Sequence, residues 1–212
     1  MARNSAASLG DRKINAPIVL ICEGEDEQDI LIWLRTARGL TESDIEIYSA
    51  KGRTNFLTFL QDVQSWSGFS QVRKVAVVGD SEENPAQSKV FLASLGDALR
   101  KGIQYIPIQL PSEVATGSLE SLVVQHISGA SGGYQCAQEW ERCVLASPIK
   151  AFNTEAQQKK AWLQVWLTHY TQSTAYSRIG YAYKNNEAVR KELTGIVPIF
   201  NKILDELLGP HV

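Results

Sequence analysis

Short runs of strand-forming residues alternate with helical segments over the first half of this chain, and this alternation is the strongest constraint on its fold. The first run, Ile18–Cys22, is apolar, rich in β-branched residues and bounded by Pro17 and Gly24, which is typical of a strand buried on both faces. The expected strands span 18–22, 45–48, 74–78 and 104–110, and the expected helices between them span 28–38, 56–66 and 87–100. Such alternation predicts an α/β fold with a mostly parallel four-stranded sheet flanked by helices.

The pattern changes after Pro111 and becomes helical. Ser118 is expected to cap a helix in which Glu120 falls in the first turn. Further helices are expected over 137–145, 155–170 and 196–208, and the polar stretch 171–186 is expected to be a break between two of them.

Length and composition favour one substantial core. A chain of 212 residues with 44% hydrophobic content can bury such a core and a helical appendage. We therefore expect a flexible tail over residues 1–15, an α/β core over 16–127 and a C-terminal helical extension over 134–212. The extension is expected to pack on the core as part of a single compact unit.

Charge and cysteine content limit the classes of function. A net charge of -2 and a pI near 6.0 argue against a nucleic-acid binder that works through a broad basic face, but not against a nuclease whose metal ions supply positive charge. Three cysteines give neither a disulfide framework nor the paired spacing of a zinc site. With no apolar run long enough to cross a membrane and no apolar signal core near the start, we expect a cytoplasmic protein that does not contact membranes.

Acidic residues follow three of the expected strands. Glu23 comes directly after the first strand, Asp80 and Glu82 come after the third, and Glu120 lies in the Gly-Ser-Leu-Glu segment after the fourth. Because the carboxyl ends of parallel strands share one edge of a sheet, we expect these acids to lie close together.

Carboxylates gathered in this way repel one another and need protons or a cation. Mg²⁺ and Mn²⁺ take hard oxygen ligands from a few carboxylates and keep other positions for water and substrate phosphate. The three histidines, His126, His169 and His211, lie away from these turns in the sequence, which argues against a histidine-based zinc site. The pattern therefore predicts a Mg²⁺ or Mn²⁺ centre.

The loop after the second expected strand carries Lys51, Arg53 and Asn55 just before a helix. Two interpretations stay open for it. The loop either caps the helix and exposes its cations to solvent, or it contacts a substrate phosphate at the helix N-terminus.

The order of these motifs resembles a Toprim domain, a Rossmann-like fold. Glu-Gly followed by acids comes after the first strand, Gly-Arg-x-Asn after the second, acid-x-acid after the third and Gly-x-Leu-Glu after the fourth. More narrowly, residues 17–125 are similar to the Toprim domain of OLD-family nucleases and to small stand-alone Toprim-like bacterial proteins. The segment containing Lys159 and Lys160 is similar to a lysine-bearing helix in that family.

The resemblance implies metal-dependent processing of phosphodiester bonds in DNA or RNA. By this resemblance Glu23 is a metal ligand or general acid/base, Asp80 and Glu82 are metal ligands, and Glu120 is an additional ligand that allows a second metal. Either Lys159 or Lys160 would stabilise charge on the phosphate.

Two positions depart from the family pattern, because Glu27 and Glu82 stand where the pattern usually has Asp. Glu reaches one methylene further, which displaces or weakens a strict octahedral Mg²⁺ site. The alternative function is therefore a catalytically weak or inactive Toprim-fold module that regulates or binds a protein partner, with self-association also open. A nucleotide-binding α/β domain is less favoured because no glycine-rich turn follows any expected strand.

Overall fold

The computed structural model describes residues 12–112, 115–127, 129, 131–147, 152, 154–171 and 178–209. The strands are β1 (Ile18–Cys22), β2 (Glu46–Ser49), β3 (Lys74–Asp80) and β4 (Gln104–Leu110). The α-helices are α1 (Glu25–Ala37), α2 (Phe56–Val63), α3 (Pro85–Ser94), α4 (Leu119–His126), α5 (Gly132–Leu145), α6 (Glu155–Thr171), α7 (Ile179–Asn185), α8 (Glu187–Glu192) and α9 (Val197–Leu208). Short 3-10 helices are η2 (Arg53–Asn55), η3 (Phe69–Gln71), η4 (Leu95–Ala98) and η5 (Thr194–Ile196).

The four strands form one parallel sheet in the order β2-β1-β3-β4. In the register of this sheet, Cys22 at the end of β1 pairs with Ser49 of β2 and Val78 of β3. The predicted α/β fold with a parallel four-stranded sheet is therefore confirmed. Because β1 and β3 are neighbours, the turns that follow them leave the sheet side by side.

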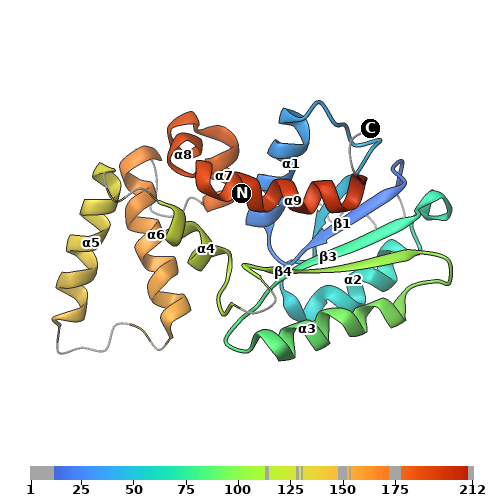
Figure 1. The fold of residues 1–212 in the computed structure, drawn as a ribbon, viewed down its shortest axis with the longest axis horizontal. Helices are drawn as coiled ribbons and strands as arrows, with labels where there is room; N and C mark the ends of the chain where they lie inside the picture. The colour runs from blue at the N-terminus through green and yellow to red at the C-terminus, as the bar shows by residue number, and fades with distance from the viewer. Residues whose placement is uncertain are drawn as a thin grey trace, which may run out of the picture.

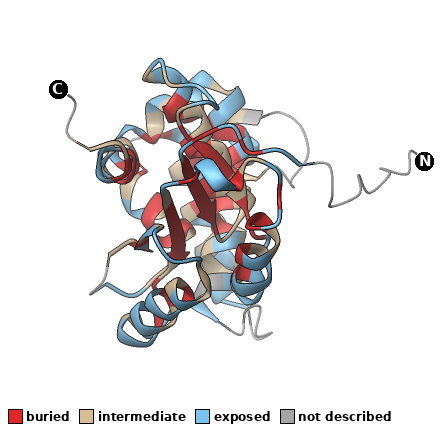
Figure 2. Ribbon diagram, turned by 90° about the vertical axis from the view of Figure 1, so that its right-hand side faces the viewer, coloured by how far each residue is buried: buried red, intermediate tan, exposed pale blue. Residues whose placement is uncertain are grey.

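Helices cover both faces of the sheet (Figure 1). On one face, Ile18 and Leu20 of β1 pack with apolar residues of α1 and α9. On the other face, Val19 and Ile21 pack with α2, α3 and the segments around them. The central strands β1 and β3 consequently lie buried in the middle of the molecule (Figure 2), as the apolar run of β1 predicts.

The core on the α1 face continues into the C-terminal helices without a break. Trp162 and Trp166 of α6 are 2% and 0% exposed and belong to the same apolar cluster as Leu20 of β1. Phe200 of α9 and Tyr183 of α7 lie in this cluster as well. The α5–α6 hairpin stands at one end of the molecule, beyond α4 (Figure 1).

Two expected boundaries in the α/β region are wrong by several residues. α1 begins at Glu25 rather than at residue 28, because the Gly24 N–H donates to the Glu27 carboxylate at 3.1 Å and so starts the helix earlier. β3 extends to Asp80 rather than ending at residue 78, since Gly79 and Asp80 continue the ladder to β4.

Two expected helices end early. α2 ends at Val63, before residue 66, and α3 ends at Ser94, where the chain tightens into the 3-10 helix η4 (Leu95–Ala98) before residue 100. Gln64, just after α2, donates through its side chain to the carbonyls of Leu60 and Ala98 and so joins the ends of the two segments.

The expectation that 171–186 separates two helices is wrong for its second half. α7 occupies Ile179–Asn185, and α8 follows directly at Glu187. α7 is too short to be stable by itself, and its stability comes from packing of Ile179, Ala182 and Tyr183 in the core. Residues 172–177 of that stretch lie outside the described ranges.

The chain is anchored to the fold before the first strand. Ile14 is fully buried, and its N–H donates to the Ser67 carbonyl at 2.8 Å. Residues 1–11 of the expected tail lie outside the described ranges. Among the helices that the structure describes, none combines the length and apolar character needed to cross a bilayer.

Candidate functional site

Glu23 leaves the end of β1 and reaches across to β3. Its Oε2 accepts a hydrogen bond from the Asp80 N–H at 3.2 Å. A Cβ on Gly79 would lie 3.3 Å from the same Oε2 and 2.9 Å from Leu92, so the missing side chain at Gly79 leaves the room that the Glu23 carboxylate occupies. The turns after β1 and β3 therefore meet at one edge of the sheet.

Asp80 connects this edge to α4. Its Oδ1 accepts a hydrogen bond from the Leu119 N–H at 3.0 Å, at the N-terminus of that helix. Ser118 is the N-cap of α4 and Glu120 lies in the first turn, as predicted, but the Ser118 hydroxyl donates to Glu120 Oε2 at 2.6 Å and makes no capping hydrogen bond to the backbone. The carboxylate of Asp80 thus satisfies a backbone donor of α4 and lies near Glu120.

Glu27 is the buried acid of the first turn of α1. It is 5% exposed and accepts the Gly24 N–H. Its pKa is raised from 4.5 to about 7, chiefly by burial and also by the negative charges of Asp26, Glu120 and Glu23, while a hydrogen bond to its own backbone lowers it. A carboxyl with this pKa is partly protonated near neutral pH.

The same causes act on Asp80 and Glu23. Burial, together with the nearby charges of Glu27, Glu23 and Glu120, raises the pKa of Asp80 from 3.8 to about 9, although the hydrogen bond from the Leu119 N–H lowers it. Burial also raises the pKa of Glu23, while the Asp80 N–H and the charge of Arg53 lower it. The four carboxyl groups, which are those of Glu23, Glu27, Asp80 and Glu120, therefore form one electrostatically coupled cluster.

The two candidate lysines of α6 occupy different surroundings. Lys160 Nζ lies 3.2 Å from Glu120 Oε1, and Glu120, Asp80 and Glu27 all raise the pKa of Lys160. Lys159 Nζ donates to the Ser121 hydroxyl at 3.2 Å and pairs with Glu155 at 2.6 Å. Lys160 is accordingly the lysine that faces the carboxyl cluster.

Glu82 lies on the exposed loop after β3 and has a positive φ of 56°. Its N–H and carbonyl both bond to Gly117, which joins this loop to the one before α4. Glu82 also lines a hollow of about 400 Å³ together with Ser121, Glu155 and Lys159. Its charge raises the pKa of Glu23, so it lies within electrostatic range of the cluster although its side chain is exposed.

The candidate phosphate contacts after β2 have protein partners. Arg53 donates to the Asp80 carbonyl and the Ser88 hydroxyl, both at 3.0 Å, and lies 4.5 Å above the centre of the Phe91 ring. Lys51 is exposed with its Nζ 3.7 Å from Glu25, and the Asn55 side chain donates to the Lys51 carbonyl. Arg53 therefore supports the backbone at the end of β3, and a role in phosphate binding stays a prediction.

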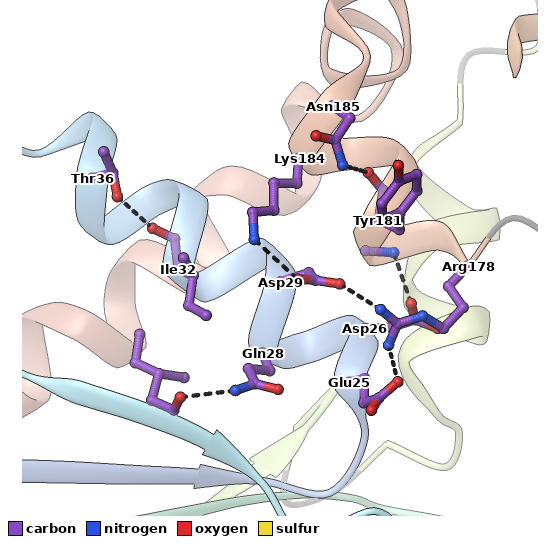
Figure 3. Close-up of polar contacts among 12 residues, drawn as sticks. Glu25, Asp26, Gln28, Asp29, Ile32, Thr36, Arg178, Tyr181, Lys184 and Asn185 are labelled. Atoms are coloured by element: carbon purple, nitrogen blue, oxygen red, sulfur yellow. Dashed lines mark hydrogen bonds and ion pairs between the residues drawn. The ribbon is translucent and has the colours of Figure 1, made fainter. Parts of the chain in front are cut away.

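The other acids near the start of α1 contact the C-terminal helical region (Figure 3). Glu25 and Asp29 pair with Arg178, and Asp26 accepts the Gly180 N–H. The dense acidic segment after β1 is consequently divided, with Glu23 and Glu27 toward the sheet edge and the other three toward the C-terminal helices.

The donor set suits Mg²⁺ or Mn²⁺ in chemistry, because it consists of carboxylate oxygens that repel one another. Over the part of the chain that the structure describes, no group of three or more His, Cys, Asp or Glu side chains is already arranged to hold an ion. Several of the carboxylates make hydrogen bonds or ion pairs within the protein, as Glu23 does with Asp80 and Glu120 with Lys160. A cation at this edge would therefore have to compete with those contacts.

One member of the cluster, Glu27, is absent from the residues that the sequence singles out as ligands. The signal was present, because Glu27 occupies the fifth position of the first motif, where the Toprim pattern has an acid. What the sequence could not reveal is that Glu27 alone among the acids of this helical turn is buried.

The fold and this edge define an α/β protein with a four-stranded parallel sheet, a C-terminal helical region and an acidic cluster where the central strands end. Comparison of the chain with protein-family models, curated proteins and solved structures finds no match.

Proposed function

We propose that this protein is a Mg²⁺- or Mn²⁺-dependent phosphodiesterase of Toprim type that cleaves nucleic acid at the carboxyl edge of its sheet. The observation that supports the proposal is the meeting at this edge of Glu23 and Asp80, from the ends of β1 and β3, with Glu120, from the first turn of α4. A coupled, partly buried cluster of carboxyl groups is costly to maintain and is more common at functional sites than elsewhere.

In this proposal, the acidic residues bind the metal ion and a lysine contacts the substrate. Glu23, Glu27, Asp80 and Glu120 provide oxygen ligands, and Glu82 adds a further carboxylate from the neighbouring loop. Mg²⁺ or Mn²⁺, when bound, supplies Lewis-acid polarisation of the phosphate and activates water for attack. Lys160 moves from Glu120 toward the substrate and stabilises negative charge on the phosphate.

Substrate affinity in this proposal depends on the cation. The chain has a net charge of -2, so no broad basic surface is available to attract DNA or RNA from a distance. Lys159 and the hydroxyl of Ser121, in the hollow beside Glu82, offer local contacts for a sugar or phosphate next to the cleaved bond.

The test is a cleavage assay with single- and double-stranded DNA and RNA, in Mn²⁺ or Mg²⁺ and in chelator. We expect metal-dependent cleavage whose rate falls at least a hundredfold in Glu23→Gln and in Asp80→Asn, because each substitution removes the charge of one metal ligand. A loss of about this size is typical when a single catalytic group is removed. The control Asp97→Asn removes an exposed acid from η4 and should cleave as wild type.

Two results would count against the proposal. Cleavage that persists unchanged in both site variants would come from a contaminant. A wild-type protein that binds Mn²⁺ but cleaves none of the four substrates would instead favour a binding or regulatory module that has kept the ion site.

A further inference from the structure

The C-terminal helical region contacts the start of α1 on the helix face that carries Glu25 and Asp29, called here the outer face (Figure 3). Arg178 reaches two acids on that face, donating through Nη1 to Glu25 and through Nη2 to Asp29 at 2.9 Å. The Gly180 N–H donates to Asp26 Oδ1 at 2.9 Å, and Lys184 Nζ lies 3.4 Å from Asp29. Three acids of α1 are therefore engaged by groups at the start and end of α7.

The approach of α7 to α1 is too close for any side chain at Gly180. A Cβ at this position would lie 2.6 Å from Asp26 Cα, and it would overlap backbone atoms that cannot move aside as a flexible side chain can. The ion pairs are thus formed beside a tight backbone contact, although the side chains of Arg178 and Glu25 remain 41% and 44% exposed. Only 15% of the Asp29 side chain is exposed.

The geometry of a helix separates these acids from the cluster at the sheet edge. Successive residues are turned by about 100° around the axis, so Glu25 and Asp29, four apart, share one face and Glu27 points to the opposite side. Arg178 holds the outer face of the same turn whose inner face presents Glu27. Its charge also offsets the repulsion among acids that are crowded into a single turn.

We propose that Arg178 is a positioning residue of the metal centre. By pairing with Glu25 and Asp29, it fixes the first turn of α1 so that Glu23 and Glu27 stay directed toward Asp80. It also keeps the outer acids of this turn away from the cation. This inference rests on the proposed function, because the role of Arg178 is defined by the ion that Glu23 and Glu27 would bind.

The loss of Mn²⁺ affinity expected on removing Arg178 follows from its position, because Arg178 contacts α1 and does not contact the ion itself. Residues that hydrogen-bond directly to metal ligands contribute about 10- to 100-fold in metal affinity, and Arg178 acts one contact further away, through α1. We therefore expect Mn²⁺ to bind Arg178→Ala about tenfold more weakly than wild type, at the lower end of that range. Arg178→Lys should recover part of this loss, because lysine keeps the charge but cannot pair with two carboxylates at once through a planar fork.

The experiment measures Mn²⁺ affinity by calorimetric titration, together with amide hydrogen exchange of residues 25–29 in the metal-free protein. Arg190→Ala is the matched control, because Arg190 lies in the same helical region and donates to the Tyr183 and Lys184 carbonyls, with its guanidinium 5.0 Å from the centre of the Trp33 ring. We expect Arg190→Ala to lower the melting temperature but to retain wild-type Mn²⁺ affinity. Amide hydrogen exchange of residues 25–29 should be faster in Arg178→Ala than in wild type, by more than the change in the global free energy of unfolding accounts for.

The outcomes separate this role from the proposed function. If wild type binds Mn²⁺ and Arg178→Ala binds it equally well, the role of Arg178 is overturned while the metal centre stands. If Arg178→Ala loses affinity only as much as Arg190→Ala does, the effect is general destabilisation and the role is again overturned. If Arg178→Ala does not fold, wild-type affinity in Arg178→Lys overturns it. Wild type that binds no Mn²⁺ removes the metal centre and this role together.

Discussion

At the scale of single residues, the site depends on which acids are buried and which are paired with cations. Glu27 is buried and Asp80 is partly buried, and the pKa values of Asp80 and Glu27 rise to about 9 and about 7. Glu25 and Asp29 pair with Arg178, and Glu120 pairs with Lys160. The energetic cost of the cluster is therefore concentrated at Asp80, where burial and three neighbouring carboxylates act together.

The raised pKa of Asp80 predicts how stability varies with pH in chelator. The folded state binds this proton more tightly than the unfolded state, so the stabilisation is complete below about pH 4 and is lost as the pH rises through about 9. Asp80→Asn keeps an oxygen that can accept the Leu119 N–H but cannot ionise. We expect the free energy of unfolding of this variant to exceed that of wild type by about 0.5–2 kcal/mol at pH 9. A gain of this size is typical when a destabilising group at a functional site is replaced.

Urea unfolding at pH 5, 7 and 9 in chelator measures this difference. Asp97→Asn, which changes an exposed acid, should follow the wild-type curve. Parallel pH dependence for wild type and Asp80→Asn would contradict the pKa shift assigned to Asp80.

At the scale of elements, the sequence predicts what depends on local pattern and fails where tertiary packing decides. The apolar run of β1 predicts its limits, because a continuous strand pattern is a local property. α7 escapes prediction because it is only seven residues long, and because Gly180 is a poor helix former that is used for its lack of a side chain. Its helical state is set by the contact with α1.

Gly180→Ala tests that contact between α7 and α1. In an isolated helix alanine is preferred over glycine, but here a Cβ meets the backbone of Asp26, so we expect a loss of about 1–3 kcal/mol or more in the free energy of unfolding. Tyr181→Ala, at the next position of α7 and 55% exposed, should change stability by no more than about 0.5 kcal/mol. Urea denaturation gives both values, and a stabilised Gly180→Ala would show that α7 does not pack against α1 in this way.

At the scale of the whole molecule, strand order and the C-terminal helices together assemble the candidate site. The order β2-β1-β3-β4 makes β1 and β3 neighbours, which places Glu23 against Asp80. The sequence predicts that these turns share one edge, because all strands are parallel. It cannot decide between Lys159 and Lys160, because adjacent residues of a helix point about 100° apart and the rotation of α6 is fixed by the burial of Trp162 and Trp166.

The central claim is that acids far apart in the chain jointly bind one kind of divalent cation at this edge, and calorimetric titration of the metal-free protein with Mn²⁺ tests it most directly. We predict saturable binding to wild type and to the control Asp97→Asn. Binding should be at least tenfold weaker in each of Glu23→Gln, Asp80→Asn and Glu120→Gln, since loss of a ligand should cost no less than loss of a group that merely orients one. Wild type that takes up no Mn²⁺ at millimolar concentration, or three site variants that bind it as wild type does, would contradict the account.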